Sequence, residues 1–138
     1  MALAAAAQLL GSLDFLFANF GEAFLERGIT TAEVGVTKAQ IREFNVDLLE
    51  YISHLHIAVA GLGMGLALAG AGLAWFGIQR GMAWAWWSAV AAITVAALVA
   101  LPAHFVYGLA TVGHLGPAFA ALGLFAIGAA LSYPKEKP

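Results

Sequence analysis

The feature that most constrains the fold is the stretch from Asn45 to Gly72, which passes from carboxylates and two histidines into a long apolar segment rich in glycine. A helix needs about 20 mostly apolar residues to cross the hydrocarbon layer of a bilayer. Lipid cannot hydrogen-bond backbone amides and carbonyls, so a spanning segment must be helical. We therefore expect a transmembrane helix with a polar entrance.

The rest of the chain has the same character. Hydrophobic residues make up 62% of the 138 residues and charged residues only 10%, which excludes an ordinary soluble fold and leaves room for one membrane domain, residues 1–138. The sequence predicts an all-α integral membrane four-helix bundle. The expected spans are residues 2–24, 51–76, 82–103 and 112–131. The segment around 104–117 is ambiguous, because Pro117 fits a loop followed by a helix start, but the two helices can also extend and meet.

The first predicted span is the least apolar, and it carries Asp14. An ionised carboxylate inside a span is costly, so Asp14 should face other helices, with Asn19 as a possible companion, or be protonated. It is either a structural residue or the proton-coupling group of a small transporter. The segment lacks the basic start of a signal peptide, so we expect it to be retained; lying along the membrane surface is an alternative.

The polar loop, residues 25–50, holds most of the charged residues. Thr30 with Glu33, and Thr37 with Gln40, have the spacing of capping boxes that start helices. Apolar residues then recur at helical spacing, which predicts an amphipathic interfacial helix leading into the second span. Asn45 can instead cap a new helix start. The apolar residues of this pattern are Ile41, Phe44, Leu48, Ile52 and Leu55.

Two glycines in the second span, Gly61 and Gly65, lie four residues apart on one helical face. This spacing allows close approach of another helix, so both are predicted helix-packing residues. Tryptophans on both sides of the Arg80 turn indicate an aromatic belt at one membrane surface.

Polar chemistry gathers at the other surface. With four spans, the four histidines and two carboxylates share that end, and they are the candidate cofactor or metal ligands: Glu22, Glu50, His54, His56, His104 and His114. Imidazoles and carboxylates suit a metal ion, a haem or other tetrapyrrole, or a quinone. The same residues are also ordinary at a membrane interface.

The two neighbouring histidines, His54 and His56, fall on different faces of the predicted helix. His54 and His56 point about 200° apart on a helix of 3.6 residues per turn, whereas Asp47, Glu50 and His54 share one stripe. A ligand site would therefore need His104 or His114 from the other hairpin.

Three function hypotheses follow. The first is an accessory or structural subunit of a membrane complex or a homo-oligomer. The second is a redox or ligand-binding membrane protein that uses the histidine end, and the third is a proton-coupled transporter that uses Asp14. No dinucleotide, phosphate-loop or zinc-protease motif is present, so whether the chain is an enzyme stays open.

The expected surroundings are a lipid bilayer and other membrane subunits or copies of the chain. The formal net charge of −2 gives no reason to expect nucleic acid, and without cysteine the redox compartment cannot be inferred. Lysine and arginine are evenly divided between the two sides. We expect a bacterial inner membrane with both termini in the cytoplasm.

Overall fold

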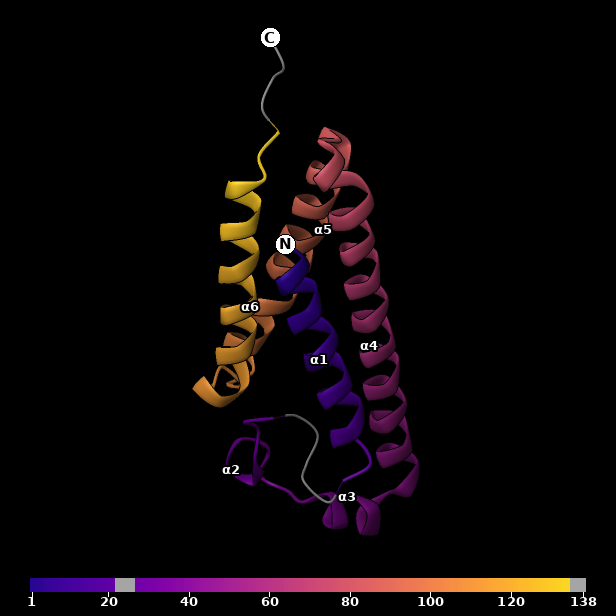
Figure 1. The fold of residues 1–138 in the computed structure, drawn as a ribbon. Coiled ribbons are helices and arrows are strands. Elements are labelled where there is room, and N and C mark those ends of the chain that lie inside the picture. The colour runs from indigo at the N-terminus through magenta and orange to yellow at the C-terminus, as the bar shows by residue number, and fades with distance from the viewer. Residues whose placement is uncertain (22–26, 135–138) are drawn as a thin grey trace.

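The computed structural model describes residues 1–21 and 27–134. These residues form helices and connecting turns, with no strand among them. In chain order the helices are α1 (Ala2–Ala18), α2 (Thr31–Val34), α3 (Lys38–Phe44), α4 (Val46–Gly72), α5 (Ala83–Val106) and α6 (Val112–Leu131). Helices α1, α4, α5 and α6 alternate in direction; α2 lies below the lower ends of α1 and α6, and α3 lies below the lower end of α4 (Figure 1).

Three helical segments are long and apolar enough to cross a membrane. They are Val46–Arg80, Ala83–Val106 and Val112–Leu131. The first combines α4 with a π-helical turn, Leu73–Gly77, and a short 3-10 turn, Ile78–Arg80. Helix α1 is apolar but has only 17 residues, so it is shorter than the predicted span 2–24.

The described part of the polar segment between α1 and α4, residues 27–45, contains two short helices, and the chain turns at Asn45 between α3 and α4. Both predicted capping boxes are present, at Thr30 with Glu33 and at Thr37 with Gln40. Of the two alternatives, one continuous helix or a new helix start at Asn45, the structure has the second, because Asn45 has extended backbone angles (φ −161°, ψ 106°) and ends α3. Its side chain accepts a hydrogen bond from the backbone N–H of Leu48 at 3.1 Å and so caps α4.

Helices α5 and α6 differ little from expectation. α5 continues through Pro102 to Val106, a few residues beyond the predicted end of its span. α6 begins at Val112 and ends at Leu131, as predicted, with Pro117 inside its first two turns. The Thr111 hydroxyl accepts a hydrogen bond from the backbone N–H of His114 at 3.1 Å, which caps the helix.

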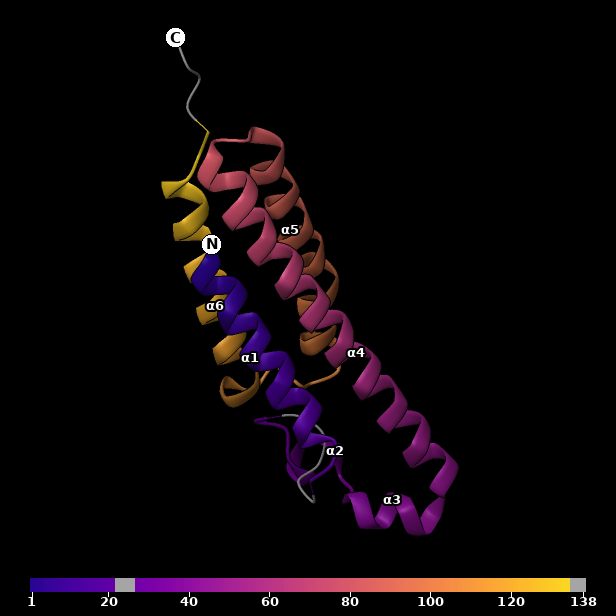
Figure 2. The same ribbon diagram turned by 45° about the vertical axis from the view of Figure 1, so that its right-hand side comes forward.

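Helices α1 and α4 lie antiparallel along a face of small residues (Figures 1 and 2). A Cβ placed on Gly63 would collide with Ser12, and one on Gly70 would lie 3.8 Å from Ala5. Farther down, the Asn19 side-chain amide donates to the Ser53 hydroxyl at 2.8 Å. The residues of α4 on this face alternate at steps of four and three: His56, Ala60, Gly63, Ala67 and Gly70.

Helix α5 contacts its neighbours near its N-terminus and is more distant from the other helices along the rest of its length. Its backbone comes close to the rest of the fold mainly at the turns Leu73–Gly77 and Ile78–Arg80. There Gly77 packs directly against Ala85. The indole N–H of Trp86, which is buried, donates to the carbonyl of Ala129 at 2.9 Å and ties α5 to α6. Below this anchor the helices leave space between them.

Candidate ligand cavity and its histidine end

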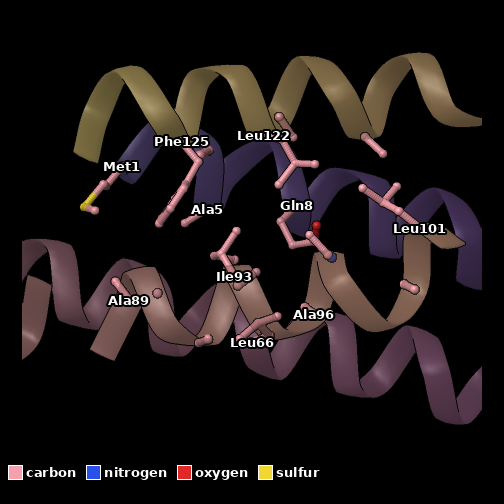
Figure 3. Close-up of a pocket in the computed structure, with 18 of the residues that line it drawn as sticks. Met1, Ala5, Gln8, Leu66, Ala89, Ile93, Ala96, Leu101, Leu122 and Phe125 are labelled. Atoms are coloured by element: carbon pink, nitrogen blue, oxygen red, sulfur yellow. The ribbon is translucent and has the colours of Figure 1, made fainter. Parts of the chain in front are cut away.

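That space is a cavity of about 390 Å³ between α1, α4, α5 and α6. Figure 3 shows Leu122 and Phe125 of α6 facing Ile93 and Ala96 of α5 across it. Alanines supply much of the wall. Their side chains are too short to fill the space between α5 and the other helices. The volume lies within the range of about 300–1,000 Å³ usual for small-molecule sites, whose walls are mostly apolar with a few polar groups.

The polar side chains of the wall are Gln8, His104 and His114. Gln8 belongs to α1, and its amide donates to the Ser12 hydroxyl at 3.4 Å. His104 is in the last turn of α5 and His114 in the first turn of α6, so the connection between these helices brings the two rings together. Their centroids are 4.9 Å apart with the planes tilted by 35°. The cavity therefore has a pair of imidazoles at one end.

Both imidazoles use Nδ1 to contact a backbone carbonyl. His104 Nδ1 lies 2.8 Å from the oxygen of Ala100, and His114 Nδ1 lies 3.2 Å from the oxygen of Arg27. A carbonyl oxygen can only accept, so each Nδ1 must carry the hydrogen. In the neutral ring, Nε2 then carries the lone pair, which is the form that binds a metal ion or accepts a hydrogen bond.

Arg27 and Gly28, which follow the undescribed residues 22–26, are hydrogen-bonded to the start of α6 at the histidine end of the cavity. The Thr111 hydroxyl donates to the carbonyl of Gly28 at 2.7 Å. Gly28 has a φ of 77° and lies against the backbone of Gly113, so a side chain there would be both strained and obstructed. Arg27 and Gly28 thereby hold the start of α6, and with it His114, in place.

Asp14 is part of an ion pair with Arg27. Both carboxylate oxygens are engaged, with Arg27 Nη2 and Nε each at 3.1 Å. Asn19 is not its companion, since Asn19 donates to Ser53. The side chains of Asp14 and Arg27 are 47% and 69% exposed, so the pair lies at the surface of the fold. Nearby, the Lys38 ammonium donates to the carbonyls of Asn19 and Gly21, at 2.8 and 2.9 Å.

The other predicted ligands lie outside the cavity. Glu50 and His54 are exposed on α4. His56 is buried on a different face, as the helical angle predicts, and its ring stacks on Phe15 with centroids 4.3 Å apart. Glu22 falls outside the described residues.

The expected cluster of four histidines is therefore not found. Within residues 1–21 and 27–134, no group of three or more histidine, aspartate or glutamate side chains is placed to hold a metal ion. The physical reason is that His56 faces α1, His54 faces outward, and only His104 and His114 face each other.

The distance between the His104 and His114 rings also indicates whether the pair could ligate a haem iron from both sides. Two imidazoles on opposite sides of one iron have centroids roughly 6 Å apart, because each metal–nitrogen bond is about 2 Å. The observed 4.9 Å is too short for that arrangement. The pair as placed suits hydrogen bonding to an organic group better than axial ligation.

Gly61 and Gly65, the predicted packing glycines, are exposed, and a Cβ on either would meet nothing within 4 Å. Sequence reasoning missed the glycines that do pack tightly within the described fold, which are Gly28, Gly63, Gly77, Gly113 and Gly128. The signal for Gly63 was present, because small residues recur along α4 at steps of four and three from Ala60 to Gly70. Nothing comparable indicated Gly28.

No protein-family model, curated protein or solved structure matches this chain significantly. The class defined by fold and composition is a small all-α protein with three candidate membrane spans and a shorter apolar helix at its N-terminus.

Proposed function

We propose that the protein is an integral membrane protein that binds a lipophilic molecule of the quinone type in the cavity between α1, α4, α5 and α6. In this arrangement the four helices form a membrane bundle with both termini on the cytoplasmic side, and α2 and α3 lie at the opposite interface. The observation that carries the proposal is an apolar cavity of about 390 Å³ with two imidazoles at one end.

The shape and lining of the cavity support this. His114 and Phe125 both line it and are eleven residues apart on α6, which corresponds to about 16 Å at 1.5 Å per residue. A space of this length with polar groups at one end fits a molecule with a ring-shaped head and an alkyl or isoprenoid tail. Empty apolar space is costly to a fold, so an occupant would also stabilise the loosely packed α5.

The test is binding of 4-decylphenol, a simple amphiphile of this shape, to the protein in lipid nanodiscs by equilibrium dialysis. Ala96→Phe places a large ring in the cavity wall and should weaken saturable binding at least tenfold. Ala91→Phe is the matched control, because Ala91 is on the same helix, is exposed and does not line the cavity. Equal binding to both variants, or no saturable binding to the unmodified protein, would contradict the proposal.

A second function, as a subunit of a homo-oligomer or larger membrane complex, is favoured by a separate observation. Gly61 and Gly65 are exposed on α4 with open space beside them. A helix of another copy or another protein would pack closely there. Cross-linking in native membranes should give dimers that Gly65→Leu removes; exclusively monomeric protein would contradict this function.

Proton-coupled transport through Asp14 has less support, because both oxygens of Asp14 are paired with Arg27. This contact favours a structural role.

A further inference from the structure

We infer that the molecule in the cavity carries a hydroxyl group, as a phenol or quinol does, and that this hydroxyl donates a hydrogen bond to Nε2 of His104. The inference rests on the proposed ligand cavity and adds the chemistry of the head group and the residue that recognises it.

The first step is the tautomer that the contact with Ala100 selects for the neutral ring of His104. Its Nδ1 lies 2.8 Å from the carbonyl oxygen of Ala100, one turn earlier on α5. Because that oxygen can only accept, Nδ1 is the protonated nitrogen and Nε2 of the neutral ring carries the lone pair. His104 therefore offers the cavity an acceptor.

The second step is that the other contacts of the His104 ring do not involve Nε2. Within residues 1–21 and 27–134, His104 makes the hydrogen bond to Ala100 and the tilted contact with the ring of His114. His114 is held differently, because its Nδ1 is directed at the carbonyl of Arg27 in the overlying loop. Of the two imidazoles, His104 is the one whose Nδ1 hydrogen bond is to its own helix.

The third step is discrimination between head groups. A hydroxyl can donate to Nε2, whereas an ether, an ester or the carbonyl of an oxidised quinone presents another lone pair and cannot. A ligand that fills the cavity would cover this acceptor, and an acceptor covered without a donor is penalised in apolar surroundings. The site should therefore prefer a phenol or quinol over a molecule of the same shape that lacks the hydroxyl hydrogen.

The residues that line the cavity indicate how the bound molecule would be oriented. The head lies between the end of α5 and the start of α6, and the tail runs along the alanine-rich wall toward Phe125 and Met1 (Figure 3). Among the described residues, Gln8 is the only polar side chain in the wall besides His104 and His114, and its amide already contacts Ser12.

The test compares 4-decylphenol with 4-decylanisole, its methyl ether, in nanodiscs. The unmodified protein should bind the phenol roughly three- to tenfold more tightly, as expected for one hydrogen bond. His104→Leu should bind both ligands equally, and His104→Gln, which keeps a side-chain acceptor, should retain part of the preference. His54→Leu is the control, because His54 is exposed on α4 outside the cavity and its loss should leave the preference unchanged.

Binding of the anisole reports that a variant retains its cavity, and His104→Phe replaces His104→Leu if leucine prevents folding. Equal affinity of the unmodified protein for phenol and anisole would overturn the head-group inference while leaving the cavity proposal standing. A preference that survives in His104→Leu or His104→Phe would overturn the assignment to His104. If neither ligand binds the unmodified protein, both proposals fail.

Discussion

At the scale of single residues, Trp86 is the side chain that joins α5 to α6 near their upper ends. Ala129 is in the last turn of α6, where carbonyls have no partner within the helix, and the indole N–H of Trp86 supplies one. Trp86→Phe keeps an aromatic ring but leaves this buried carbonyl without its donor, so it should destabilise the protein by about 1–3 kcal/mol.

Trp87→Phe is the natural comparison, because Trp87 is the next residue and is 57% exposed. The two variants are compared by thermal unfolding in a mild detergent. Trp87→Phe should unfold close to the unmodified protein and Trp86→Phe at a lower temperature. Identical unfolding of the two would show that the α5–α6 hydrogen bond contributes nothing measurable.

Gly77 is the second residue on which the position of α5 depends. An added methyl group would overlap the Cβ of Ala85, and neither group can rotate away. Gly77→Ala should therefore push the start of α5 outward at a cost of roughly 1–3 kcal/mol. In Gly72→Ala the new methyl meets nothing within 4 Å, so this variant should unfold like the unmodified protein. The same unfolding assay separates them, and equal stability would contradict the close contact.

At the scale of elements, α2 shows how a short helix depends on the residue that caps its N-terminus, Thr30. The hydroxyl and the backbone N–H of Thr30 both donate to a Glu33 oxygen at 2.7 Å, and these hydrogen bonds lower the pKa of Glu33 below its ordinary value. Because the folded-state pKa is depressed, the stabilisation is present above the ordinary pKa of glutamate and is lost as pH falls through the folded-state value.

Thr30→Ala removes the hydroxyl, which is the larger cause, and should raise the pKa of Glu33 toward its ordinary value. The measurement is a carbon-13 NMR titration of the Glu33 carboxyl group. Thr37→Ala, which disrupts the equivalent capping box of α3, should leave the Glu33 titration unchanged. An unaltered pKa in Thr30→Ala would contradict the role of the hydroxyl.

Element positions were largely predictable because they depend on local chemistry. The capping boxes identify the starts of α2 and α3, and the long apolar runs identify α4, α5 and α6. Asn45 was ambiguous, because the apolar pattern across it is compatible with one continuous helix. The chain turns at Asn45 because capping of α4 by the asparagine is more favourable than continuing the helix through it. The apolar periodicity alone does not show which of these two effects is larger.

The candidate site was predictable only in part. Chain order places His104 and His114 at one end of their hairpin, so their meeting follows from topology. The cavity depends on how far α5 stands from α1 and α4, which is set by contacts such as Gly77 with Ala85. The contacts of Arg27 with Asp14 and His114 join parts of the chain far apart in sequence, and no local pattern indicates them.

At the scale of the whole molecule, the alternating helices predict which segments share a side of the membrane. The turn Ile78–Arg80 and the end of α6 lie at one end of the fold, and α3 lies at the other (Figure 1). Gln79 belongs to that turn, Pro134 follows α6 by three residues, and Glu43 belongs to α3. The natural chain has no cysteine, so single cysteines can be labelled without background. With a membrane-impermeant maleimide, Gln79→Cys and Pro134→Cys should react from the same side and Glu43→Cys from the opposite side. Reaction of Pro134→Cys from the Glu43 side would contradict the proposed arrangement.

The central claim for the whole molecule is that the space beside α5 holds an amphiphile with its head at His104. The most direct measurement is a crystal structure of the protein with 4-(10-bromodecyl)phenol, in which anomalous scattering locates the bromine. The account predicts the phenol oxygen within hydrogen-bond distance of His104 Nε2 and the bromine between α5 and α6 near Phe125. Bromine on the outer surface of the helices, or at the histidine end with the phenol at Phe125, would contradict it.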